Sequence, residues 1–144
     1  MEEQLPLVEP VVRHGNAPTF IQANTFDALK IKSIFESIRT KGHRSIALIC
    51  KTSIEALKMQ KTLTDHKINA QLLTENDSID QELLLVVPSH LAKGLEFDAV
   101  IIAAFDTPFY DTKLDRKLLY VALTRAMHEL YLIGPAKEAF LLES

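Results

Sequence analysis

The sequence predicts an α/β fold in which helices cover both faces of a mostly parallel β-sheet. Several continuously apolar runs have the length of a strand, as expected for strands that are buried on both faces. Segments with helical spacing of apolar residues alternate with these runs. The chain has 144 residues and 47% hydrophobic content, which is enough for one buried core. A single globular domain is the simplest prediction.

The first 18 residues are expected to form an extended lead-in to a domain that spans residues 19–144. Proline and glycine recur in this segment at a spacing that interrupts any periodic element, at Pro6, Pro10, Gly15 and Pro18. The domain therefore starts with the first ordered strand, which we expect at Thr19 to Gln22.

A helix is predicted next, capped by Asn24 or Thr25 and continuing through Lys41. Gly42 closes it, because glycine readily adopts the left-handed conformation that ends many helices. The apolar positions that predict this helix are Phe26, Leu29, Ile34, Phe35 and Ile38.

A second strand and helix follow, with the strand more obvious than the helix. Ser45 to Cys50 is an apolar run of strand length, and Thr52 or Ser53 caps the following helix. Its apolar positions are Ile54, Leu57, Met59 and Leu63. A strand that leads into a helix is half of a βαβ unit.

The rest of the chain continues the alternation. The expected elements are a weaker strand at Ala70 to Leu73, a loop at Thr74 to Ser78, strands at Leu83 to Val87 and Ala99 to Ala104, a helix from about Asp111 to Met127, and a last strand at Glu129 to Ile133. Asp106 to Pro108 and Gly134-Pro135 mark strand ends. In such sheets ligands bind beyond the carboxyl ends of strands.

Composition limits the classes of function. The net charge of −3 argues against bulk electrostatic binding of nucleic acid, so any such contact is expected to be local or shared between domains. Cys50 is the only cysteine, which excludes an intrachain disulfide and a thiolate metal cluster and predicts a small core residue. The histidines lack the i, i+4 spacing of a helical zinc site, so no structural metal is expected.

No apolar run approaches the roughly 20 residues that a membrane helix requires. The acidic start, Met1-Glu2-Glu3, lacks the basic then apolar order of a secretory signal. We therefore expect a cytoplasmic protein without a membrane partner.

The loop from Pro88 to Asp98 lies between two buried strands and is therefore expected at the carboxyl edge of the sheet, where ligands usually bind. It holds the first group of candidate site residues: His90, Lys93, Gly94 and Glu96. A glycine allows positive φ or close approach of the backbone to a ligand, and a neighbouring lysine can meet a phosphate. Glu96 could accept hydrogen bonds from ribose hydroxyls. The alternative is an ordinary polar connection between two strands.

Arg125 ends an apolar stripe, Leu114, Leu118 and Val121, in the predicted helix. If the stripe packs on the sheet, the guanidinium emerges at the rim of the core and needs an anionic partner. Alternatively, Arg125 only complements the negative end of the helix dipole. Thr124 could likewise bond a backbone carbonyl or face a ligand.

Two segments resemble motifs of the UvrD/Rep-type superfamily 1 helicases. Residues 93–98, KGLEFD, resemble motif V, and residues 116–126, RKLLYVALTRA, resemble motif VI. The resemblance is strongest over residues 86–133. Residues 45–63 look like the strand and helix upstream of motif V, and residues 13–18, RHGNAP, are similar to the segment that follows motif IV.

The resemblance implies a three-layer RecA-like second motor domain whose motif VI arginine, Arg125, reaches the γ-phosphate of ATP. Gly94 and Glu96 would line the nucleotide, with Glu96 toward the ribose. The residues implied to couple ATP to single-stranded DNA are Ser89, His90, Lys93 and Thr124. ATP and Mg²⁺ would be held mainly by an N-terminal RecA-like domain of the same parent chain.

Departures from the family pattern also carry information. No G-x-x-x-x-G-K-[ST] phosphate loop or acidic magnesium motif occurs, so the chain is expected not to hydrolyse ATP alone. The motif IV arginine has no counterpart, and Arg13 is too near the start to replace it. These departures indicate a fragment of a longer motor.

Residues 90–98, HLAKGLEFD, and 125–130, RAMHEL, look closest to the HelD and helicase IV branch. The short segment from Thr64 to Gln81 leaves no room for the accessory subdomain that UvrD carries, which favours the same branch. HelD-like proteins bind and release RNA polymerase, so two functions stay open: a DNA helicase motor and a polymerase-remodelling motor. A non-catalytic interaction module is a third.

Overall fold

The computed structural model describes residues 18–75, 80, 82–105, 113–136 and 140. Within these residues, six strands form one sheet in the order β1-β6-β5-β2-β4-β3, and every neighbouring pair is parallel. The strands are β1 Thr19–Gln22, β2 Ile46–Cys50, β3 Ala70–Leu72, β4 Leu84–Pro88, β5 Phe97–Ala103 and β6 Ala126–Gly134. The lead-in predicted for residues 1–18 lies outside the described residues except for Pro18.

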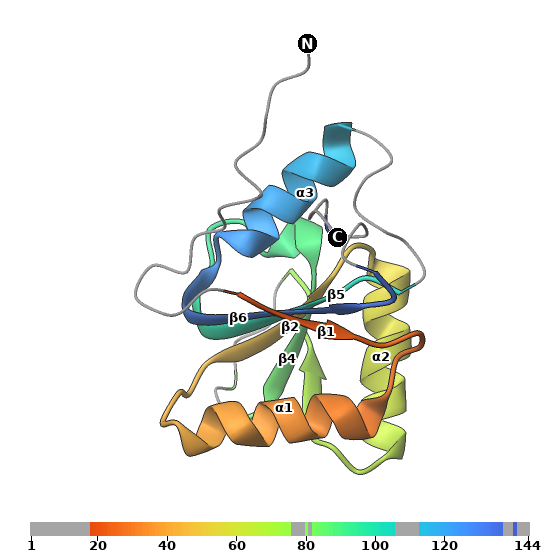
Figure 1. Cartoon of the computed structure of the whole chain (residues 1–144), viewed down its shortest axis with the longest axis vertical. Coiled ribbons are helices and arrows are strands. Elements are labelled where there is room, and N and C mark those ends of the chain that lie inside the picture. Colours follow the sequence, from red (N-terminus) through yellow and green to blue (C-terminus); the bar gives the residue numbers. More distant parts are fainter. Residues whose placement is uncertain (1–17, 76–79, 81, 106–112, 137–139, 141–144) are drawn as a thin grey trace.

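Helices cover both faces of this sheet, as Figure 1 shows. They are α1 Ala28–Thr40, α2 Ser53–Asp65 and α3 Lys113–Leu123, with a short 3-10 helix, η2, at Ser89–Leu91. Helix α3 lies on one face, whereas α1 and α2 lie on the other. The predicted three-layer α/β architecture is therefore confirmed.

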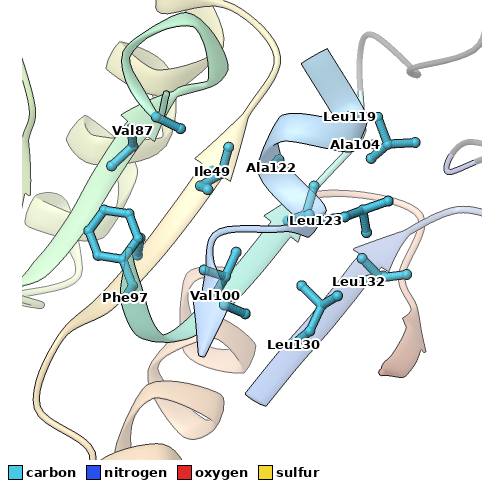
Figure 2. Packing of buried hydrophobic residues seen from close by; sticks show 14 of the residues in the cluster. Ile49, Val87, Phe97, Val100, Ala104, Leu119, Ala122, Leu123, Leu130 and Leu132 are labelled. Atoms are coloured by element: carbon cyan, nitrogen blue, oxygen red, sulfur yellow. The ribbon is translucent and has the colours of Figure 1, made fainter. Parts of the chain in front are cut away.

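The sheet separates two hydrophobic layers, because successive side chains of a strand point to opposite faces. In β2, Ala47 and Ile49 pack toward α3, whereas Ile46, Leu48 and Cys50 pack toward α1 and α2. Figure 2 shows the layer under α3, where Leu119, Ala122 and Leu123 meet the strands. This two-sided burial explains why the strands read as continuous apolar runs.

Cys50 is fully buried, as its apolar surroundings in the sequence predicted. Burial first, and the nearby Glu55 carboxylate second, raise the pKa of the Cys50 thiol well above its ordinary range. The thiol is therefore a protonated core group rather than a nucleophile.

Helix α1 starts later than predicted. Its cap is Asp27, whose carboxylate accepts hydrogen bonds from the backbone N–H groups of Leu29 and Lys30 at 3.0 and 3.3 Å, so the assignment to Asn24 or Thr25 was wrong. Leu29 is 61% exposed, and its place in the core is taken by residues one turn apart, Ala28, Ile31, Ile34 and Ile38. Gly42 follows the helix with φ +96°, as expected for the residue that closes it.

Helix α2 is capped by Thr52, whose hydroxyl accepts from the Glu55 N–H at 3.1 Å, as one of the two predicted candidates. Of its predicted apolar positions, Met59 and Leu63 are buried, whereas Ile54 and Leu57 are 74% and 42% exposed. A helix that crosses a sheet buries only one stripe, and that stripe is Ala56, Met59 and Leu63.

Helix α3 ends at Leu123, four residues before the predicted end at Met127. Residues 124 and 125 form a turn, and Ala126 is already the first residue of β6, paired with Phe97 of β5. Leu114, the first residue of the proposed stripe, is 63% exposed, whereas Leu118 and Val121 are partly buried against the core, so only the later part of the stripe that ends in Arg125 packs on the sheet. Strand pairing ends the helix earlier than its periodicity suggests.

A β-bulge lies at the start of the β5 and β6 pair. Phe97 pairs with Ala126, but Ala99 pairs with Glu129, so two steps along β5 match three along β6. One extra residue of β6 is accommodated there. Bulges change the direction of side chains and are frequent next to functional sites.

Candidate functional site

The parallel strands give the sheet two chemically distinct edges. We call the side where strands begin the amino edge and the side where they end the carboxyl edge. β4 ends at Pro88 and β5 begins at Phe97, and both run in the same direction beside β2. The connection between them must therefore cross from the carboxyl edge to the amino edge.

This crossing divides the loop that the sequence presented as one site. Ser89 and His90 follow the end of β4, whereas Gly94 and Glu96 come just before the start of β5. The prediction that the loop as a whole lies at the carboxyl edge was therefore wrong. The two groups lie on either side of the buried Ala92, whose N–H donates to the Ser89 carbonyl at 3.1 Å and whose carbonyl accepts from the Leu95 N–H at 3.0 Å.

At the amino edge, the ends of the two motifs lie side by side. The Phe97 N–H donates to the Arg125 carbonyl at 2.9 Å, so the chain around Glu96 runs next to the turn that carries Arg125. Gly94 has φ +84° and no atom within 4 Å of where a Cβ would be, so its conformation favours glycine for backbone reasons alone. Lys93 and Glu96 are exposed on the same loop.

Arg125 has an incompletely satisfied guanidinium. Its Nη2 donates to Thr124 Oγ1 at 3.1 Å, whereas its Nε is buried and, within the described residues, has no hydrogen-bond partner. No described carboxylate lies within ion-pair distance of it. A buried donor without a partner is costly, which makes this atom the clearest candidate for an anionic ligand.

Thr124 has the more common of its two predicted roles. Its hydroxyl lies 3.1 Å from the Tyr120 carbonyl and 3.0 Å from the Val121 carbonyl, at the end of α3, and accepts from Arg125. The threonine therefore fixes the end of the helix and orients the guanidinium that follows it.

The carboxyl edge holds Ser89 and His90. Ser89 is 1% exposed and donates from Oγ to the Lys51 carbonyl at 2.8 Å, which ties η2 to the end of β2. His90 is exposed and lines a hollow of about 400 Å³. The other lining residues are Ser53, Leu72, Leu73, Thr74, Glu75, Pro88 and Leu91. The structure does not bring Lys93 or Thr124 to this hollow.

A buried ion pair at the carboxyl edge was not predicted from the sequence. Lys51 Nζ lies 2.8 Å from Asp115 Oδ1, with side-chain exposures of 16% and 7%. It joins the end of β2 to the first turn of α3. The two residues lie far apart in the sequence, so only the fold reveals the pair.

A second feature missed by sequence reasoning holds the α1–β2 turn, residues 41–45. Asp98 Oδ2 accepts from the backbone N–H groups of Arg44 and Ser45 at 2.9 and 3.3 Å. Burial opposes ionisation of Asp98, but these two donors and the nearby His43 and His128 outweigh it, so the pKa of this carboxyl lies below its ordinary value.

Glu129 holds the same turn from β6. Its Oε1 accepts from Tyr131 at 2.6 Å and from Lys41 at 3.1 Å, and its Oε2 lies 3.1 Å from His43 Nε2. Burial raises the pKa of Glu129, but the hydrogen bonds from Tyr131 and Lys41 outweigh that effect, so the pKa lies below its ordinary value. Asp98 and Glu129 together fix the turn next to the bulge.

Two kinds of feature are absent from the described residues. No group of three or more His, Cys, Asp or Glu side chains in them is arranged to hold a metal ion. None of their helices has both the length and the apolar character needed to cross a membrane.

Comparison with known proteins identifies the domain type. Residues 83–133 match the UvrD-like helicase C-terminal domain. The solved structure of the C-terminal domain of a possible DNA helicase from Lactobacillus plantarum WCFS1 is 30% identical, with a TM-score of 0.74 over 88% of this chain and 79% of that chain. No curated protein matches the chain. The fold is therefore RecA-like, and the chain belongs to the family of UvrD-like helicase C-terminal domains.

Proposed function

We propose that this chain is the C-terminal motor domain of an ATP-dependent superfamily 1 DNA helicase in the cytoplasm. Its ATP and Mg²⁺ are held mainly by an N-terminal RecA-like domain, and Arg125 is the arginine finger that reaches the γ-phosphate. The observation that carries this proposal is the buried Arg125 Nε, which has no partner in the described residues.

The chemistry of phosphoryl transfer suits this arginine. Negative charge spreads over the γ-phosphate oxygens in the transition state, and a guanidinium that meets them increases turnover by about 10³ to 10⁵. The bond from Arg125 Nη2 to Thr124 orients the planar group and leaves other N–H groups for the phosphate. The finger therefore needs little reorganisation when the nucleotide arrives.

Gly94 and Glu96 are proposed to line the nucleotide from the neighbouring loop. The hydrogen bond between Phe97 and Arg125 holds this loop beside the finger, which supports one shared nucleotide surface at the amino edge. Glu96 would accept from the ribose hydroxyls. We assign Thr124 to the same surface because its hydroxyl accepts from Arg125, and Lys93 because it directly precedes Gly94 on the same loop.

His90 is proposed to contact single-stranded DNA at the carboxyl edge, with Ser89 fixing the loop that carries it. The hollow of about 400 Å³ beside His90 supports this assignment, since ligands of open α/β sheets bind beyond the carboxyl ends of strands. ATP and DNA would then meet this domain at opposite edges of its sheet.

The decisive experiment compares Arg125→Ala with Arg125→Lys in a protein that contains both motor domains. We expect Arg125→Ala to lower ATP turnover by at least about 10³ and to change ATP affinity little. Lysine keeps the charge but loses the planar fork, so Arg125→Lys should recover only a small part of the turnover. Arg116→Ala, on α3 in the same motif, is the matched arginine control and should retain turnover.

Unchanged turnover in Arg125→Ala would remove the finger assignment. The isolated chain should show no ATPase activity, because it has no phosphate loop. Robust turnover by the isolated chain would contradict the requirement for a second domain.

A HelD-like motor that remodels RNA polymerase is the second candidate. Between the end of α2 and the start of β4, the only element in the described residues is the three-residue β3, which supports a motor without a large insertion at this point. Capture of RNA polymerase by the two-domain protein, with release on ATP addition, would favour this candidate. Translocation on DNA without polymerase binding would favour the helicase.

A further inference from the structure

A second hollow opens on the other flank of α2. It has a volume of about 160 Å³ and lies at the carboxyl edge on the face covered by α1 and α2. Its lining residues come from the segment after β1, from α2 and from the end of β5: Asn24, Thr25, Phe26, Glu55, Lys58, Met59, Thr62 and Phe105. We call it the phenylalanine pocket. Neither the family match nor the proposed ATP and His90 contacts assign it a role.

Two aromatic rings give this pocket its shape. The centroids of Phe26 and Phe105 are 6.0 Å apart, and their planes meet at 86°, so the rings form two walls of a right-angled corner. A flat ring can stack on one wall while its edge meets the other. Met59, 5% exposed, adds an apolar side chain to the lining.

The polar side chains of the pocket select the kind of group that fits. Glu55 is 4% exposed and lines the pocket, and a carboxylate in this position accepts hydrogen bonds from amino groups. Lys58 adds a cation that can donate to a ring carbonyl, and Asn24, Thr25 and Thr62 add further hydrogen-bonding groups. The pocket therefore suits a flat ring that carries N–H donors.

Size and overall charge narrow the ligand further. At about 30 Å³ per water molecule, the hollow holds about five waters, which is the scale of one small ring and too little for a whole nucleotide. The chain has a net charge of −3, so it gains little from binding phosphates. Stacking of bases on aromatic side chains does not depend on a basic surface.

We propose that the phenylalanine pocket receives one unpaired nucleobase, preferentially one with an exocyclic amino group, from the single strand that passes His90. The proposal rests on the proposed DNA contact and adds a second point of contact to it. Ser53 at the start of α2 lines the His90 hollow, and Glu55 and Met59 of the same helix line the pocket. The strand would cross the first turns of α2 between the two.

The absence of tryptophan from the chain allows a direct test. Phe105→Trp places a single tryptophan in the pocket wall, excited selectively above the tyrosine absorption, and Tyr120→Trp places one on α3, on the opposite face of the sheet, as the control. The probes are a labelled oligo(dC), an abasic strand of the same length, ATP and free arginine, all at concentrations up to millimolar. Anisotropy of the labelled strand measures binding independently of the tryptophan signal.

We expect oligo(dC) to quench the fluorescence of Phe105→Trp and not that of Tyr120→Trp. The abasic strand, ATP and arginine should leave the fluorescence of both variants unchanged. Phe26→Ala should lower oligo(dC) affinity about tenfold without changing the affinity for the abasic strand. Phe26→Tyr, which keeps the ring, should retain the affinity if it folds as judged by circular dichroism. Glu55→Gln should reduce the preference for oligo(dC) over oligo(dT).

The other outcomes overturn the proposal in distinguishable ways. If oligo(dC) binds but the fluorescence of Phe105→Trp does not change, the pocket inference fails and the proposed DNA contact stands. Quenching by ATP alone would show that the pocket takes free nucleotides, and quenching by arginine alone would indicate a protein side chain. If no strand binds at all, the pocket and the DNA contact fail together.

Discussion

The two edges of the sheet satisfy their polar groups to different degrees. At the carboxyl edge, the Ser89 hydroxyl bonds the Lys51 carbonyl and the Lys51 ammonium pairs with Asp115. At the amino edge, Arg125 Nε has no partner among the described residues and Gly94 has φ +84°. Among the described residues, the buried side-chain polar groups of the carboxyl edge have partners, whereas the amino edge holds an unsatisfied donor next to a backbone that favours glycine.

This difference indicates that the two edges hold different kinds of site. Unsatisfied or strained groups persist when the surrounding structure holds them in place, and they concentrate at functional sites. The amino edge therefore has the properties of a site whose chemistry is completed by another molecule. The carboxyl edge is a preformed surface with hollows, as expected for a binding platform.

The largest predicted effect on stability is at the carboxyl edge. Lys51→Met leaves Asp115 buried without its cation, and we expect a loss of about 3 kcal/mol in the free energy of unfolding, measured in urea. The value is at the low end for buried pairs, because the first turn of α3 also stabilises Asp115.

The control for this prediction is the double variant with Lys51→Met and Asp115→Leu. An apolar pair of similar volume should recover most of the lost stability. A single variant that loses less than about 0.5 kcal/mol would show that the pair does not stabilise the carboxyl edge.

A smaller effect is expected from Gly94→Ala at the amino edge. Alanine in the left-handed region costs about 1–2 kcal/mol, and no neighbouring atom adds a clash. Gly42→Ala is a matched control, since Gly42 also has a positive φ and open space around it.

Both glycine variants should lose similar stability in thermal unfolding. Only Gly94→Ala should raise the KM for ATP in a protein with both motor domains. An equal KM change in the two variants would mean that the Gly94 loop does not contact the nucleotide.

Protonation of Glu129 at acid pH should weaken its interactions with the α1–β2 turn. The pKa of Glu129 in the folded protein lies below the ordinary value of about 4.3. Its contribution to the free energy of unfolding is therefore complete above that pH. The contribution is lost as the pH falls through the lowered value. Thermal unfolding of Glu129→Gln should therefore depend less on pH below about 4.3 than that of the wild type.

Glu36→Gln, an exposed substitution on α1, should leave the pH dependence of unfolding as it is in the wild type. If both variants had the wild-type pH dependence, Glu129 would not be a source of acid sensitivity.

The smallest effect is expected from His90→Ala. The side chain is exposed, so the free energy of unfolding should change by less than about 0.5 kcal/mol. Affinity for single-stranded DNA should fall about threefold, measured by anisotropy, if one hydrogen bond is lost. Lys67→Ala, an exposed residue after α2, is the control; an equal loss in both would indicate only non-specific charge effects.

The positions of the strands and their burial could be predicted, because the strands are apolar on both faces. Leu84 to Val87 and Ala99 to Ala103 each read as buried runs and are buried in the fold. The cap at Thr52 and the closing glycine at 42 also follow from local chemistry that tertiary contacts leave unchanged.

The helix faces and one helix end could not be predicted, because tertiary contacts decide them. Ile54 and Leu57 have helical spacing yet face solvent, since the position of α2 on the sheet selects another stripe. Ala126 looks like a continuation of α3, but pairing with Phe97 makes it a strand residue. Periodicity indicates which faces are possible, and packing selects among them.

The sequence indicated which residues are candidates for the site, but not where the fold places them. Gly94, Glu96 and Arg125 are brought to one edge, whereas His90 lies at the other, because parallel strands oblige the connection to cross the sheet. The Lys51 and Asp115 pair and the corner of Phe26 and Phe105 join distant segments, so no local pattern announces them.

The position of β5 in the sheet has a mechanical consequence. This strand is hydrogen-bonded to β2 on one side and β6 on the other, and all its residues except Asp98 are buried. Sliding it along its axis would break both ladders at once, whereas tilting the whole sheet breaks neither. Because packed interiors are nearly incompressible, a displacement of one end of β5 along its axis should displace the other end by a similar amount.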